Sequence, residues 1–178
     1  PATKPAPPLL GTQDQAGPPP AHPAPQRRGG PDAFGYVFDD SHEPGGPAFG
    51  WIAGTDVITR LHQDDYTVTV SLPFALNFYG VVYQNLFIST NGNLQMASYD
   101  ARDYDNVCLP DPTYTRQLGI IAPFWDDMYL MNANGGDIYT AVVGTAPNRI
   151  YTVEWRNVEF YQRPGTRVTA EVLLYENN

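Results

Sequence analysis

Short apolar segments that end at a turn sequence or at polar residues recur along this chain, and they limit the folds that it can adopt. Residues 86–94 run through Asn91-Gly92, and residues 119–127 end on two adjacent aspartates. Residues 66–72 alternate between polar and apolar side chains with a period of two. Segments of this kind are typical of short β-strands, and no stretch has a convincing helical period. The sequence therefore predicts an all-β protein, an antiparallel β-sandwich of jelly-roll-like type.

The positions of the expected strands follow from these segments. Asn91-Gly92 and Ala146-Pro147-Asn148 are turn sequences between apolar runs, so each predicts a hairpin. Residues 100–115 are expected to form a polar loop. Strands are expected at residues 34–38, 66–72, 75–79, 81–83, 85–89, 94–96, 138–143, 149–155 and 168–175.

The N-terminal segment has a different composition. Nine of the 18 prolines lie in the first thirty residues, which contain no aromatic residue. Proline lacks an amide donor and favours the extended polyproline II conformation. We therefore predict two parts, an extended proline-rich N-terminal arm over residues 1–31 and a β-sandwich domain over residues 32–178. The arm is either a solvated linker or an assembly element, and its candidate anchors for assembly are Leu9, Leu10, Thr12 and Gln13.

The charge of the chain excludes some partners. The net charge is −9, and the arm contributes about +2 because Lys4, Arg27 and Arg28 outnumber Asp14, which leaves about −11 for the rest. An acidic surface disfavours a nucleic-acid partner. No apolar run is long enough to cross a membrane, so membrane insertion is not expected. The first residue is Pro1 rather than Met, which implies either processing or a fragment. We expect removal of a secretion signal and an extracellular protein, either secreted or on the cell surface.

No arrangement of residues in the sequence predicts catalysis. His22, His42 and His62 have no metal-binding spacing with one another. Asp126 and Asp127 are adjacent, so on a strand their carboxylates would point to opposite faces and could not act as a pair. Cys108 is the single cysteine, which excludes an internal disulfide. We therefore expect a protein that is not an enzyme.

One short span is rich in oxygen-bearing side chains and contains Gly135-Gly136. Calcium prefers such hard oxygen ligands from a flexible loop, but the spacing does not fit an EF-hand. Asparagine, aspartate and glycine are also favoured in surface hairpins for conformational reasons alone. A bound calcium ion and a plain hairpin are therefore alternatives here, and no other cofactor is expected. The candidate ligands are Asp126, Asp127, Asn132, Asn134 and Asp137.

The aromatic residues have two interpretations. Trp51, Trp125 and Trp155 could form a platform for stacking sugars, but tryptophans more often fill the space between two sheets. We expect them in the core. The tyrosines of the polar loop are candidates for contacts with a partner, namely Tyr99, Tyr104 and Tyr114.

Several motifs in order resemble a known module. They are Phe34-Gly-Tyr, Leu72-Pro-Phe, Phe78-Tyr-Gly, Ser89-Thr-Asn-Gly, Ile121-Ala-Pro-Phe-Trp-Asp-Asp and Pro147-Asn-Arg. Together they resemble a β-sandwich module of bacterial secreted and cell-surface proteins, and more distantly the nidogen-type extracellular domain. The resemblance covers roughly residues 34–175. It implies an accessory module, often joined to proteases, adhesins or other large exported proteins, without a catalytic role of its own.

The C-terminus departs from that family pattern. The resemblance implies a glycine turn and one more apolar strand after residues 173–176, whereas this sequence ends at Asn178. Either the chain was cut there, or an open sheet edge accepts a strand from another molecule. On the second alternative, the edge residues for assembly are Val168, Ala170, Val172 and Leu174.

Two functions are compatible with these features. The leading hypothesis is an extracellular structural subunit that assembles with other copies of itself into a filament or surface layer, through its arm and its open strand edge. The alternative is a ligand-binding or carbohydrate-binding accessory module of a larger secreted protein.

Overall fold

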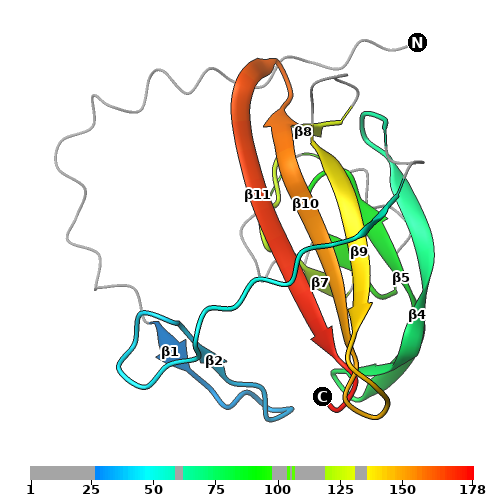
Figure 1. Cartoon of the computed structure of the whole chain (residues 1–178). Coiled ribbons are helices and arrows are strands. Elements are labelled where there is room, and N and C mark those ends of the chain that lie inside the picture. The colour runs from blue at the N-terminus through cyan, green and yellow to red at the C-terminus, as the bar shows by residue number, and fades with distance from the viewer. Residues whose placement is uncertain (1–26, 59–61, 98–103, 105, 107–118, 131–135) are drawn as a thin grey trace, which may run out of the picture. The chain divides into compact units, whose positions relative to one another are not determined.

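The computed structural model describes residues 27–58, 62–97, 104, 106, 119–130 and 136–178 (Figure 1). Contacts divide the chain into two compact units, Pro1–Gly50 and Trp51–Asn178. The boundary predicted at residues 31 and 32 falls inside the first unit and stays a prediction. Within the described residues every regular element is a strand, and no helix there has the length and apolar character needed to cross a membrane.

The first unit contains a small two-stranded sheet of β1 (Arg28–Gly29) and β2 (Phe38–Asp39). Arg28 donates two hydrogen bonds to the Asp39 carboxylate, each 2.9 Å long. Of the strand expected at residues 34–38, only Phe38 is in a strand. The Asp32 carboxylate accepts the amides of Phe34 and Tyr36 and holds this segment in a turn instead.

The second unit contains two antiparallel sheets (Figure 1). The first has the order β11-β10-β9-β3, and β8 also pairs with β10. Its strands are β3 (Asp56–Val57), β8 (Met128–Tyr129), β9 (Asp137–Val143), β10 (Ile150–Phe160) and β11 (Arg163–Tyr175). The second has the order β4-β5-β6-β7. Its strands are β4 (Thr67–Phe78), β5 (Val81–Ser89), β6 (Leu94–Gln95) and β7 (Ile120–Ile121).

One hydrophobic core lies between the two sheets. The second sheet contributes Leu76 and Ile88, and the first contributes Val153 and Trp155, all in the same cluster of buried side chains. The indole nitrogen of Trp155 donates to the backbone oxygen of Ser89 at 2.9 Å and so joins the two layers. These features confirm the predicted all-β antiparallel sandwich.

Two pairs of expected strands are continuous in the structure. The strands expected at residues 66–72 and 75–79 are both part of β4 except for their outermost residues, Tyr66 and Tyr79, and the pairing of β4 with β5 shifts register between Ser71 and Leu76. The irregularity accommodates Pro73, which cannot donate a ladder hydrogen bond. Residues 81–83 and 85–89 likewise form one strand, β5.

Both predicted hairpins are present. The loop at Asn91-Gly92 has three residues, because the Ser89 amide donates to the Asn93 oxygen at 3.0 Å. Gly92 takes the left-handed backbone conformation that such a loop needs, with φ at 72°. The second hairpin joins β9 to β10, which pair from Val143 and Ile150 onward.

Candidate functional site

The longest strand lies at a margin of its sheet. β11 has 13 residues and pairs with β10 alone among the described strands. Figure 1 shows it along the outer side of the β9–β10–β11 sheet. Its other side therefore presents backbone donors and acceptors that belong to no ladder in the described part of the chain.

The register identifies which residues present these groups. The Glu176 amide donates to the Arg149 oxygen at 2.9 Å, and this pair continues the register that aligns Ile150 with Tyr175. Hydrogen-bonded and non-hydrogen-bonded pairs alternate in an antiparallel ladder. The backbone groups directed away from β10 in the second half of β11 therefore belong to Glu171, Leu173 and Tyr175.

The edge residues predicted from the sequence lie at the alternate positions. Leu174 is buried in the core, and Val168 and Val172 pack against it, while Ala170 is half-buried. Ala170, Val172 and Leu174 direct their backbone groups to β10. The role of these residues in assembly stays a prediction, and the predicted anchors in the arm, Leu9, Leu10, Thr12 and Gln13, lie outside the described residues.

A short segment before β3 crosses the outer face of this sheet and is anchored on two carboxylates. The Ile52 amide donates to Glu171 Oε1 at 3.3 Å, and the Gly54 amide donates to Glu154 Oε2 at 2.8 Å. Glu154 and Glu171 are directly opposite each other on β10 and β11. We call residues 51–55 the strap.

The two carboxylates have opposite pKa shifts. Burial acts to raise the pKa of Glu154, but hydrogen bonds from Arg156, Gly54 and the Trp51 side chain lower it below its ordinary value. Burial raises the pKa of Glu171, and the nearby charge of Glu154 adds to this, against one hydrogen bond from Ile52. Glu171 Oε2 is buried and has no hydrogen-bond partner among the described residues. The fold therefore stabilises the charged form of Glu154 and disfavours the charged form of Glu171.

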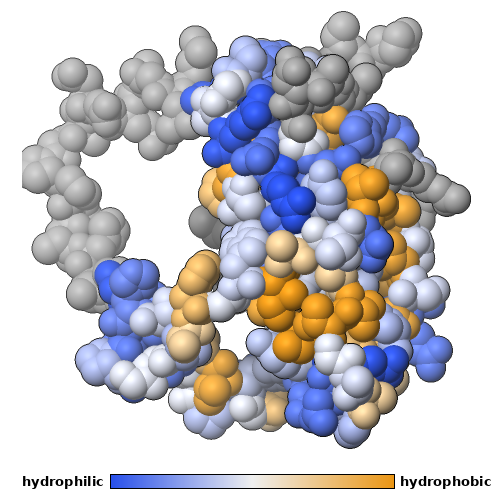
Figure 2. Space-filling view, viewed as in Figure 1, coloured by the Kyte–Doolittle hydropathy of each residue, from blue (hydrophilic) through white to orange (hydrophobic). Residues whose placement is uncertain are grey.

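Arg156 lies under the strap, and its positive charge offsets the negative charge of Glu154. Its guanidinium contacts Glu154 at 2.6 Å, donates to the Gly54 oxygen at 2.9 Å, and lies 4.0 Å from the centre of the Tyr139 ring. Figure 2 shows apolar side chains gathered on the face of the β9–β10–β11 sheet that is turned to the viewer. The outer face therefore has an apolar surface beside the ion pair of Glu154 and Arg156.

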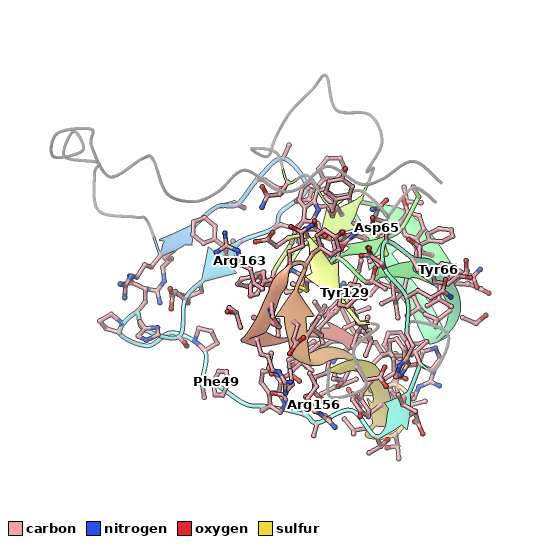
Figure 3. The ribbon with its side chains drawn as sticks, turned by 90° about the horizontal axis from the view of Figure 1, so that it is seen from above. Phe49, Asp65, Tyr66, Tyr129, Arg156 and Arg163 are labelled. Carbon is pink, nitrogen blue, oxygen red and sulfur yellow. The ribbon has the colours of Figure 1, made fainter. Side chains whose placement is uncertain are left out.

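A second cluster lies at the end of the sandwich where β4 begins. One oxygen each from Asp64, Asp65 and Asp127 lies within 4.8 Å of the others. Figure 3 shows Asp65 in the same region as Tyr129, and Asp64 forms an isolated bridge with Tyr129. Three carboxylate oxygens at this spacing have the chemistry of a site for a hard divalent cation.

The buried Asn91 holds these loops together. Its side-chain amide donates to Asp65 Oδ1 at 2.9 Å, and its oxygen accepts the Met128 amide at 3.0 Å. Gly92 packs so closely that an added Cβ would overlap the backbone oxygen of Phe124. The hairpin loop thus sets the distance between the segments that carry the three aspartates.

The predicted calcium ligands are distributed over several places. Only Asp127 belongs to the aspartate cluster. Asp126 accepts the amide of Asp127 at 2.7 Å, and Asp137 contacts His62 at 2.7 Å. Asn132 and Asn134 lie outside the described residues, and calcium binding stays a prediction. Asp64 and Asp65 were missed because only the folded loops bring them beside Asp127.

The aromatic candidates also occupy different environments. Trp125 and Trp155 are buried, whereas Trp51 is 40% exposed. Tyr104 is half-buried. Tyr99 and Tyr114 lie outside the described residues, so partner contacts by these tyrosines stay a prediction.

Comparison with known proteins places this domain in a family. The family model described as NIDO related matches residues 35–178. Comparisons with curated proteins and with solved structures found no match. The chain therefore belongs to the NIDO-related family, and its nidogen-like domain suggests an extracellular context.

Proposed function

We propose that this chain is a non-enzymatic structural subunit of an extracellular assembly, secreted or on the cell surface. In this proposal, copies associate through the open edge of β11 and through the proline-rich arm to build a filament or a surface layer. The observation that carries it is the 13-residue strand β11, which pairs on one side only among the described strands.

The second half of β11 has little protection against pairing with another strand. Natural edge strands are guarded by charges, prolines or bulges. In β11 the proline, Pro164, and two arginines lie in the first half. The charged residue of the second half is Glu171, whose carboxylate accepts the Ile52 amide. Residues 170–175 therefore suit backbone pairing with a second chain.

Edge pairing alone would end at a dimer. Two identical β11 edges that pair with each other make the same contact on both copies, which is a closed arrangement. Growth into a filament or layer needs a second contact of a different kind. The arm is the natural source, because proline is a poor donor to a sheet ladder and must bind elsewhere.

Leu173→Pro tests the edge contact. Leu173 directs its amide away from β10, so proline there removes a donor to the partner strand and leaves the β10–β11 ladder intact. We expect a folded protein whose association is about tenfold weaker or more, measured by sedimentation velocity over a concentration series. Each lost backbone hydrogen bond accounts for about 0.5–1.5 kcal/mol.

Leu173→Ala is the matched control, because it shortens the same side chain and keeps the amide. It should associate within about twofold of the wild type, since the ladder donor is unchanged. If both variants associate like the unaltered chain, or if Leu173→Ala is as weak as Leu173→Pro, the edge is not the contact.

The alternative function, a ligand-binding accessory module of a larger secreted protein, makes the opposite prediction for the same measurement. Such a module would remain a monomer at every concentration. Static light scattering of the unaltered chain separates the two functions before any variant is made.

A further inference from the structure

An apolar groove lies on the second sheet, whose strands do not pair with β11. It has a volume of about 370 Å³ and is formed where β4 turns into β5 and where β7 passes alongside. Its lining residues are Phe78, Tyr79, Val81, Tyr83, Gly119 and Ile120.

The groove continues the face of the sheet that carries the core. Leu76 is a core residue, and it pairs across the strands with Tyr83. Phe78 pairs in the same way with Val81, two positions along. Residues opposite each other share a face, so the groove is the part of the core face that described side chains leave accessible. Val81 is 51% exposed there.

Aromatic rings shape the walls of the groove. The rings of Phe78 and Tyr79 meet edge to face, with centroids 4.8 Å apart and planes at 87°. Tyr79 has a left-handed backbone, with φ at 51°, and Gly80 follows with φ at 77°. The chain reverses at this turn directly after Phe78, so both rings lie at the corner between β4 and β5.

We propose that this groove binds the proline-rich arm and that, in the assembly, the arm comes from a neighbouring copy. This inference rests on the proposed function. Proline-rich segments in the polyproline II conformation dock into grooves lined by aromatic rings, because they are extended and ordered before they bind. The first thirty residues of this chain hold nine of its prolines, and the groove has the matching chemistry.

Length and charge both permit the arm as the occupant. The 26 residues before Arg27 span up to about 80 Å at ~3.1 Å per residue in polyproline II, enough to reach another molecule. Residues 1–26 carry one positive and one negative side chain, Lys4 and Asp14, so the segment has no net charge that opposes burial against apolar side chains. Leu9 and Leu10 follow Pro7-Pro8 and are the side chains best suited to fill the groove.

The groove and the β11 edge are then two different contacts. One binds a segment that cannot join a ladder, and the other pairs a strand through its backbone. A copy that offers its arm to one neighbour and its edge to another has the two unlike contacts that growth beyond a dimer requires.

Val81→Glu and Val82→Glu in the full chain test the groove. A fluorescently labelled synthetic peptide of residues 1–26 is titrated with each protein, and its anisotropy is measured. Val81 lines the groove, whereas Val82 is its neighbour on the same strand, is 63% exposed and is not among the lining residues. Both variants add the same charge to the same strand, so only the position differs.

We expect Val81→Glu to weaken peptide binding about tenfold or more, because it places a charge in an apolar groove, and Val82→Glu to stay within about twofold of the wild type. Tyr79→Ser, at a second exposed lining position, should weaken binding like Val81→Glu. Circular dichroism confirms that each variant is folded.

The outcomes separate this inference from the proposed function. If the unaltered chain does not bind the peptide, or if Val81→Glu and Val82→Glu lose binding equally, the groove is not the site for the arm, even where sedimentation shows assembly. If binding depends on Val81 but the unaltered chain is a monomer at every concentration, the groove binds the arm and the proposed assembly is wrong.

Discussion

Gly92 shows how a single position can hold one end of this sandwich together. It has a left-handed backbone, and it packs against the segment that leads to Asp127. Its neighbour Asn91 is fully buried and joins Asp65 to Met128. The Ser-Thr-Asn-Gly sequence is therefore more than a turn signal, because its backbone and side chains tie three loops to one another.

Gly92→Ala should destabilise the protein by about 3 kcal/mol or more. The added methyl combines overpacking against the Phe124 oxygen with a disfavoured backbone conformation. Gly165→Ala is the matched control, because Gly165 also has a positive φ, 86°, but an added Cβ would meet nothing within 4 Å. Gly165→Ala should lower the free energy of unfolding by about 1–2 kcal/mol, from the disfavoured backbone conformation alone. Chemical denaturation measures both, and equal losses would show that the contact with Phe124 does not matter.

At the scale of elements, the strap and the β10–β11 pair form one electrostatic unit. Glu154 and Glu171 face each other across the strands, and each accepts an amide from the strap. Arg156 contacts Glu154, whereas the interaction that favours the charged form of Glu171 is one hydrogen bond from the Ile52 amide. The strap therefore depends on two acids whose pKa values are shifted in opposite directions.

Glu171→Gln should stabilise the protein near pH 7, with a melting temperature higher by about 2–4 °C. The folded pKa of Glu171 is raised, so its protonated form favours folding at low pH, and this contribution is lost as pH rises through the raised pKa. Glutamine is neutral at every pH, so the variant does not lose this contribution to stability as pH rises. The difference in melting temperature between the variant and the wild type should vanish below the ordinary pKa of about 4.5, because Glu171 is then protonated in both the folded and the unfolded protein.

Glu154→Gln is the opposite control at the paired position. The pKa of Glu154 is lowered in the fold, so the ionised group contributes stability above its ordinary pKa, and this is lost as pH falls. The variant should melt at a lower temperature near pH 7. Thermal melts of both variants from pH 3 to 8 check the signs, and two variants that shift in the same direction would contradict this account of the strap.

At the scale of the whole molecule, the arm and the sandwich have separate roles in the proposed assembly. Removal of residues 1–26 leaves the β1–β2 pair, with its Arg28 and Asp39 contact, in place. The shortened chain should stay folded and form no species larger than a dimer, because the β11 edge alone makes a closed contact.

Sedimentation velocity of the shortened chain beside the full chain measures this. Circular dichroism of the shortened chain should retain the β signal and the melting temperature of the full chain within a few degrees. Polymers of the shortened chain that are as long as those of the full chain would show that the arm has no part in assembly.

The fold class could be read from the sequence because the period of a strand is local. Alternation over residues 66–72 and the turn signals at Asn91-Gly92 and Ala146-Pro147 need only neighbouring residues to be recognised, and they led to the sandwich and both hairpins. The continuity of β4 could not be read in the same way. Pro73 looks like an interruption until the partner strand shows a register shift that accommodates it.

The candidate sites depended on contacts between distant segments. Alternation showed that β11 has two sets of residues, but the pairing with β10 decided that Glu171, Leu173 and Tyr175 direct their backbone groups to the open edge. The joining of Asp64 and Asp65 with Asp127 needs two segments that are distant in the sequence to meet, and no local pattern encodes such a meeting. Local periodicity thus determined the kind of structure, whereas long-range register and loop packing determined which groups are presented.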